Sequence, residues 1–183
     1  MNKLLYVIPH RTLYNFPLID GMAQNIRVDV IYSPVDKSAG FGEDVLPDNP
    51  NIQWFEHHTW EAFKNRNFGK YQLGVVNHML KTRPDAVLIY SNANYINYWF
   101  VLLLGKLLGI PVYSRGHGLV KKVNPNILHM LAYFLMVNLS EKYVCYAPIV
   151  QDSLEKLALK KGKFGVDYNF QYNDSPISPD QKT

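Results

Sequence analysis

Cysteine is nearly absent from this sequence of 183 residues, and long apolar runs are missing altogether. Cys145 is the only cysteine, so neither a disulfide within the chain nor a cysteine metal cluster can form, which is typical of a reducing compartment. No stretch reaches the roughly 18 to 20 apolar residues of a membrane-spanning helix. The apolar run at 4–8 is stopped by Pro9, too early for a signal peptide. We therefore expect a cytoplasmic protein.

Charge is also sparse and evenly spread. The formal net charge is +4, and the densest basic cluster is residues 160–163. Such a balance attracts anionic lipid or phosphorylated substrates only weakly, and it lacks the long basic runs typical of nucleic-acid-binding arms. We expect no nucleic-acid partner. Apolar residues, in contrast, make up 48% of the chain, which is enough to fill a core.

Several sequence motifs are missing. The first apolar run leads into Pro9 and His10 with no glycine before Gly21, so the glycine-rich turn of a dinucleotide site is absent. There is no phosphate-binding loop of a nucleoside triphosphatase and no Gly-x-Ser-x-Gly motif of an α/β-hydrolase. The pair His57 and His58 lacks a third ligand at metal-site spacing. We expect neither a metal nor a cofactor.

The sequence contains a regular alternation of short apolar runs and helical patterns. Strands are predicted at 4–8, 27–33, 52–56, 85–90, from 111, 142–147 and 164–169, and helices at 17–25, 60–67, 71–82, 95–108, 125–140 and 150–160. Alternation of this kind predicts a Rossmann-like open parallel sheet with helices on both faces. Residues 1–169 form one such domain in this interpretation, and 170–183 read as a linker or disordered tail.

One stretch stands out within this pattern. An apolar run from Ile110 leads through Arg115 into His117, which lies between Gly116 and Gly118. Glycine packs poorly inside a strand, so the two glycines indicate a sharp exit from the strand that lets another molecule approach the backbone.

Polar residues follow several predicted strands at the point where each strand ends. They are His10 and Arg11, then Ser91, Asn92 and Asn94, then Arg115 and His117. Because the carboxyl ends of parallel strands meet at one edge of a sheet, we expect these residues in a single crevice that suits a polyhydroxylated or phosphorylated ligand. Each of them could instead be a turn residue that satisfies the local backbone.

The order of these segments resembles the N-terminal half of a GT-B glycosyltransferase of the family-4 type, over residues 1–169. The resemblance is carried by Arg115-Gly116-His117-Gly118-Leu119, a basic loop, an apolar helix and Tyr143-Val144-Cys145-Tyr146, and by the phrases at 84–90 and 109–112. It implies an acceptor-binding domain, with the nucleotide-sugar donor bound mainly by a C-terminal domain and no other cofactor.

The resemblance also implies roles for residues. His117 matches a histidine near the transferred sugar, so we expect it to be catalytic; an imidazole can donate to a sugar hydroxyl or take an acceptor proton. Arg115 and Lys121 would neutralise a phosphorylated acceptor or an anionic lipid surface. The acceptor would be a glycan or a lipid-linked molecule, used in cell-surface polysaccharide synthesis at the inner face of the membrane.

Two departures from the family pattern leave alternatives open. His10 and Arg11 replace a glycine-rich loop, and the donor half with its pair of glutamates is not in this sequence. The chain is then an acceptor domain that is inactive alone, or one subunit of a split transferase that meets its donor domain in trans, or a non-catalytic Rossmann-like module for a phosphorylated ligand. An exposed apolar docking face would also favour self-association.

Two predicted helices are apolar on nearly every side. A buried position in the sheet explains residues 95–108. Residues 127–139 are explained either by burial or by one face that contacts a membrane peripherally, and Lys121 and Lys122 lie next to this segment.

Overall fold

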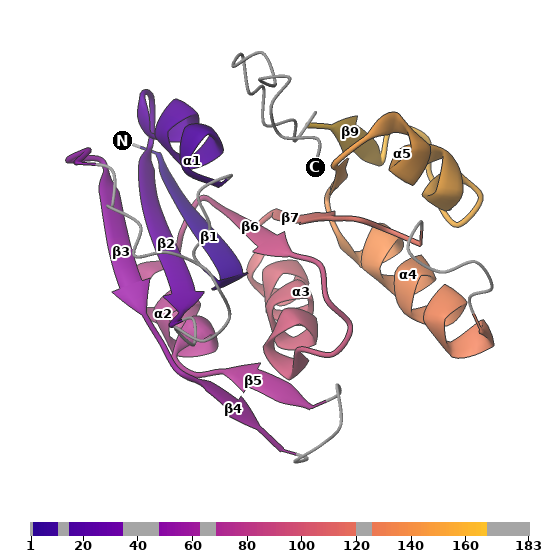
Figure 1. Ribbon diagram of the computed structural model, residues 1–183, viewed down its shortest axis with the longest axis horizontal. Coiled ribbons are helices and arrows are strands. Elements are labelled where there is room, and N and C mark those ends of the chain that lie inside the picture. Colours follow the sequence, from indigo (N-terminus) through magenta and orange to yellow (C-terminus); the bar gives the residue numbers. More distant parts are fainter. Residues whose placement is uncertain (1, 11–14, 35–47, 63–68, 120–125, 168–183) are drawn as a thin grey trace, which may run out of the picture.

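The computed structural model describes residues 2–10, 15–34, 48–62, 69–119 and 126–167. Its centre is a seven-stranded sheet in the order β3-β2-β1-β6-β7-β8-β9, in which every pair of neighbours is parallel (Figure 1). The strands are β1 (Lys3–His10), β2 (Arg27–Ser33), β3 (Ile52–Glu56), β6 (Ala86–Tyr90), β7 (Val112–Gly116), β8 (Tyr143–Cys145) and β9 (Phe164–Val166). The predicted fold class is confirmed.

The helices cover both faces of this sheet. They are α1 (Phe16–Ala23), α2 (Val75–Thr82), α3 (Ile96–Leu108), α4 (Ile127–Leu139) and α5 (Pro148–Glu155). Helix α1 packs on one face, where Ile19 joins a core with β1, β2 and β3, and the other four helices contribute to the core on the opposite face. Residues 4–8 of β1 are therefore all buried, as expected of a strand covered on both sides.

The order in which the chain adds strands to the sheet reverses at β1. Strands β2 and β3 follow on one side of β1, and β6 pairs with its other side. Ligands of doubly wound sheets bind at the carboxyl ends of the strands near such a reversal. This topology identifies the edge of the sheet at which a site is expected.

The segment between β3 and α2 differs from its prediction. Where the sequence predicted a helical turn from residue 60 and a helix from Tyr71, the chain forms an antiparallel pair, β4 (Thr59–Glu61) and β5 (Lys70–Gln72). Residues 63–67 of the predicted turn lie outside the described residues. Helix α2 begins only after Gly74, whose φ of 81° lies in the left-handed region. A Cβ there would lie 2.5 Å from the His57 ring, so tertiary crowding requires a glycine turn. The helix predicted at 71–82 is therefore confirmed only from Val75, and its predicted start was wrong.

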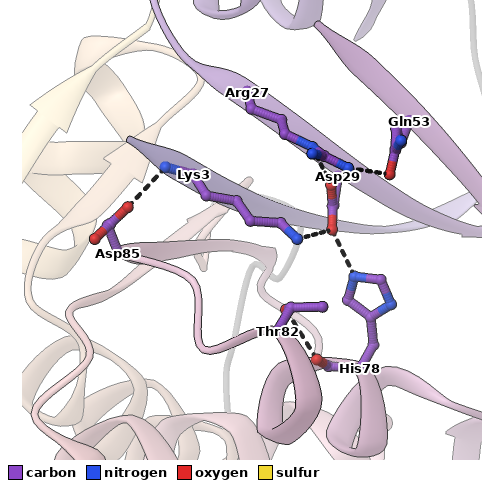
Figure 2. Close-up of polar contacts among 7 residues, drawn as sticks. All are labelled: Lys3, Arg27, Asp29, Gln53, His78, Thr82 and Asp85. Atoms are coloured by element: carbon purple, nitrogen blue, oxygen red, sulfur yellow. Dashed lines mark hydrogen bonds and ion pairs between the residues drawn. The ribbon is translucent and has the colours of Figure 1, made fainter. Parts of the chain in front are cut away.

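A buried carboxylate holds three elements together at the amino ends of the strands. Figure 2 shows Asp29 of β2, which is 1% exposed, with Lys3 of β1 and His78 of α2 reaching its side chain. The Oδ2 atom of Asp29 lies 2.7 Å from Lys3 Nζ and 2.7 Å from His78 Nε2. The carboxylate is thus compensated from two neighbouring elements, as burial of a charge requires.

The end of β7 is placed by close contacts that only glycine permits. A Cβ on Gly116 would lie 2.1 Å from Ser91 Oγ and 3.0 Å from the Tyr143 hydroxyl. Gly118 has a φ of +57° and packs against Val150 and Leu154 of α5. The sequence predicted that these two glycines let another molecule approach the backbone. In the structure they leave room for Ser91, Tyr143 and helix α5 of this chain, and these contacts position residues 116–118.

We expect Asp29→Asn to lower the free energy of unfolding by about 2 to 3 kcal/mol. Removal of one partner of a buried ion pair costs roughly 3 to 5 kcal/mol, and the cost is reduced here because Lys3 can reach water. Urea denaturation measures the change. Substitution of the exposed Asp152 on α5 by Asn serves as the control, and equal stability of the two variants would contradict a structural role for the cluster.

Gly116→Ala should destabilise the fold by about 1 to 3 kcal/mol, because its Cβ cannot fit beside Ser91 without moving it. Gly165→Ala on β9 is the matched control, since a Cβ added there would have no other atom within 4 Å. Denaturant midpoints of both variants test the difference. A Gly116→Ala protein as stable as the control would show that the close approach to Ser91 is not needed.

The Cys145 thiol should be unreactive in the folded chain. Cys145 is fully buried, and burial, assisted by the charge of Asp167, raises the pKa of its thiol to about 12. A thiol-specific reagent at about pH 8 should modify it only after unfolding, because the thiolate is the reactive form. Stoichiometric modification of the folded protein would refute this assignment.

Candidate functional site

The carboxyl edge of the sheet contains a cleft of about 240 Å³. Segment 90–94 at the end of β6 and segment 117–119 after β7 line it, together with His129 and Tyr133 of α4. The cleft lies where a doubly wound sheet places its ligands. It is also large enough for part of a sugar, whereas the cavity beside Gln72 and Tyr98 measures about 10 Å³ and has room for about one water molecule.

Another cleft of about 180 Å³ lies at the opposite edge of the sheet, between the C-terminal ends of α3 and α4. Its lining is about equally polar and apolar and includes Lys106 and Glu141. Amino edges of parallel sheets seldom hold active sites, so the cleft at the carboxyl edge is the candidate site.

The loop after β6 forms one wall of the candidate cleft. The backbone N–H of Ser91 donates to the carbonyl of Arg115 at 2.8 Å, and Ser91 Oγ lies 2.5 Å from the Tyr143 hydroxyl. The Asn92 side chain accepts from the Asn94 N–H at 3.0 Å, a turn of the Asx type. These bonds agree with a structural role for Asn92 Oδ1, and they hold the whole loop in a defined conformation.

His117 forms part of the facing wall. Its ring is half-buried and lies edge-on to Tyr146, with 4.2 Å between ring centroids. The flanking glycines place this ring, since Gly116 fits under Ser91 and Gly118 takes a left-handed conformation against α5. The imidazole therefore comes from a segment whose backbone is positioned on both sides.

Helix α4 contributes two residues that sequence reasoning missed. His129 and Tyr133 are four positions apart and so lie on the same side of the helix, facing the cleft. The His129 ring is oriented by Asn126, whose side chain accepts from the His129 backbone N–H at 2.9 Å and bonds its Nδ1 atom. The available signal was that His129 and Tyr133 interrupt an otherwise apolar helix at helical spacing.

Arg115 does not fit the predicted contact with a phosphorylated acceptor. Its side chain is 2% exposed, and its Nε atom lies 2.5 Å from Asp167 Oδ2. Its Nη1 atom donates to Tyr6, Asn15 and Tyr146 at 3.0 to 3.3 Å. Successive residues of a strand point to opposite faces of the sheet, and Arg115 points to the face that α1 covers, where Tyr6 and Asn15 lie. Its guanidinium is therefore bonded to side chains of this chain. It is a positioning residue.

The other predicted residues are divided among three places. Ser91, Asn92, Asn94, His117 and Gly118 come together in the cleft. Gly116 lies beneath Ser91, and His10 is exposed at the end of β1, opposite Ser33, without lining the cleft. Arg11 and Lys121 lie outside the described residues, as does the predicted tail. The binding and catalytic roles of all these residues stay predictions.

The lining suits hydrogen bonding to a polyhydroxylated ligand. Amides, a hydroxyl, two imidazoles and tyrosines contribute to it, and among the described residues it contains no carboxylate, lysine or arginine. Histidine is the side chain best suited to proton transfer near neutral pH, so His117 and His129 are the candidates for acid–base work. No group of metal-ligating residues occurs in the described part of the chain.

No family model and no curated protein sequence matches this chain. Among solved structures, UDP-GlcNAc 2-epimerase from Methanocaldococcus jannaschii is similar, with a TM-score of 0.59 and 18% identity over 90% of this chain and 45% of that one. The enzyme of the same name from Rickettsia bellii has a TM-score of 0.61 and 13% identity, over 91% and 44% of the two chains. Anabaena Alr3699/HepE, solved with UDP and glucose, has a TM-score of 0.57 and 14% identity, over 92% and 44%.

The chain thus spans less than half the length of these similar structures. At 13 to 18% sequence identity, these similarities show the fold alone. UDP-GlcNAc 2-epimerases share the GT-B fold with glycosyltransferases, and the described sheet and helices match one half of it. The chain is a Rossmann-like domain of the GT-B type.

Proposed function

We propose that this chain is the acceptor-binding N-terminal domain of a glycosyltransferase, which transfers a sugar from a nucleotide-sugar to a glycan or lipid-linked acceptor in cell-surface polysaccharide synthesis. The observation that carries the proposal is the cleft at the carboxyl edge, where His117 faces the amide-bearing loop 91–94. Two similar structures add support, since Anabaena Alr3699/HepE was solved with UDP and glucose and with UDP-glucose.

The chemistry of the cleft fits the acceptor better than the donor. Sugar hydroxyls both donate and accept hydrogen bonds, and side-chain amides, hydroxyls and imidazoles can also do both. A nucleoside diphosphate, in contrast, is stabilised as a leaving group by cations, metal ions or helix N-termini aimed at its oxygens. The described lining contains hydrogen-bonding groups of the first kind, and this proposal assigns the donor to another domain, in cis or in trans.

His117 is the catalytic residue in this proposal. Its imidazole donates to a hydroxyl of the transferred sugar or takes the proton of the acceptor hydroxyl. Ser91, Asn92, Asn94 and the backbone at Gly118 orient the acceptor. In this proposal a donor domain stabilises the departing diphosphate, which is usually the largest catalytic contribution, so we expect residues 1–183 by themselves not to catalyse transfer.

A nucleotide-sugar epimerase is the second candidate, because three of the similar structures are UDP-GlcNAc 2-epimerases. The two candidates differ in what the cleft binds. An epimerase converts the sugar nucleotide itself and needs no separate acceptor, whereas a transferase domain of this kind binds the acceptor without the nucleotide. A non-catalytic module for a phosphorylated ligand is a further alternative, since Lys121 and Lys122, which follow the lining residue Leu119, lie outside the described residues.

Titration of the isotope-labelled chain with a panel of oligosaccharides, followed by NMR, tests the proposal. We expect shifts centred on the backbone amides of 91–94, 117–119, His129 and Tyr133, and about tenfold weaker binding for His117→Ala, which corresponds to the loss of one or two hydrogen bonds. The control is His58→Ala, an exposed histidine that does not line the cleft.

The same titration with UDP-glucose and UDP-GlcNAc separates the candidates. No binding of either nucleotide-sugar agrees with an acceptor domain. Conversion of UDP-GlcNAc by this chain would support the epimerase instead. Sugar transfer by this chain alone, abolished in His117→Ala, would show that a separate donor domain is not required.

A further inference from the structure

Helices α3 and α4 present large apolar side chains to solvent. On α3 these residues recur at helical spacing, and Leu107 is 80% exposed; on α4 the most exposed is Ile127, at 82%. We call this surface the α3–α4 apolar face. Its residues are Phe100, Leu103 and Leu107 of α3 and Ile127, Leu128, Leu131 and Leu135 of α4.

This arrangement is the reverse of an ordinary surface helix, whose outer side is polar. The inner side of α3 is already filled by Val101 and Leu102, and that of α4 by Met136 and Val137. The exposed leucines are therefore not needed for the core described here. The two helices are in contact with each other, so these exposed side chains gather on two neighbouring helices.

The charged residues at one end of the face are mainly lysines. Neither helix contains aspartate or glutamate, and Lys106 lies in the last turn of α3. Lys163 Nζ donates to the carbonyl of Ser140, directly after α4, at 2.6 Å. Lys163 Nζ also lies 3.3 Å from the carbonyl of Glu141, and Lys106 lines the same cleft as Glu141. Partial burial lowers the pKa of Lys163, and the charges of Lys106 and Lys160 lower it further. Glu141 is the acidic group that faces this cluster.

We propose that the α3–α4 apolar face docks on the surface of an anionic lipid bilayer, with Lys106, Lys160 and Lys163 at the headgroup phosphates. Interfacial proteins combine apolar side chains, inserted at the boundary of the acyl chains, with lysines attracted to anionic lipid. The helices lie on the bilayer, since no described helix is long and apolar enough to cross it. A second copy of the chain would oppose this face with helices that also lack acidic residues, whereas an anionic bilayer supplies the missing negative charge.

The docking proposal is independent of the proposed reaction. It has a consequence for the cleft, however, because His129 and Tyr133 belong to α4, and His129 lies in the same first turn of the helix as Ile127 and Leu128. The cleft therefore opens beside the docked face and within reach of molecules held at the bilayer surface.

Sedimentation with lipid vesicles tests the proposal. We expect the chain to bind vesicles of phosphatidylcholine with about a third phosphatidylglycerol, and to bind pure phosphatidylcholine vesicles much less. The double substitution Leu107→Gln and Leu131→Gln should weaken binding about tenfold or more, since each leucine loses its apolar contact while glutamine keeps the helix propensity. Lys106→Glu should weaken binding by a similar factor, and less so at high salt.

Matched controls come from α2. Leu80→Gln changes an exposed leucine, and Lys81→Glu reverses an exposed lysine, on a helix that packs on the other side of α3 from α4. Both should bind vesicles like the unsubstituted chain, and circular dichroism confirms that each variant is folded. Absence of binding to anionic vesicles would overturn the proposal, as would equal binding by the α3–α4 variants and the α2 controls. A dimer in sedimentation equilibrium that the double substitution dissociates, without vesicle binding, would assign the face to a second copy.

Discussion

The buried guanidinium of Arg115 is the interaction on which the carboxyl edge of this domain depends. A charge taken out of water must be surrounded by acceptors, and these come from segments far apart in the sequence. Tyr6 belongs to β1, Asn15 precedes α1, Tyr146 follows β8, and Asp167 follows β9. The central strands and the far edge of the sheet are thereby held in one arrangement, just below the candidate cleft.

The same arrangement reaches His117 through Tyr146. The Tyr146 ring lies 4.4 Å from the Arg115 guanidinium carbon and 4.2 Å from the His117 ring, so one aromatic side chain contacts both. Gly116 adds a second constraint, because it brings β7 against Ser91 where a larger residue cannot fit. The imidazole is thus placed by buried neighbours, and the cleft is preorganised before any ligand arrives.

The two ends of the parallel strands differ in what they hold: a buried ion cluster at the amino ends and the candidate cleft at the carboxyl ends. At the amino ends, the Asp29 cluster ties β2 to β1 and α2, and it serves the fold. At the carboxyl ends, loops rather than strand interiors provide the lining, which is the usual division in parallel sheets. Helix α4 links the cleft to the outer surface, since one side carries His129 and Tyr133 while another exposes leucines.

The sequence alone determined the fold class, because short apolar runs that alternate with helical patterns leave few arrangements besides a parallel sheet covered on both faces. It also indicated that the loop after β6 and the segment around His117 lie together, since parallel strands end at one edge. The direction of Arg115 was decided by tertiary structure: neighbouring strand residues face opposite sides, and the sequence does not say which side holds Tyr6 and Asn15. Tertiary contacts likewise put β5 in place of the first residues of a predicted helix, and brought His129 to the cleft, because crowding at Gly74 and the packing of α4 are long-range effects.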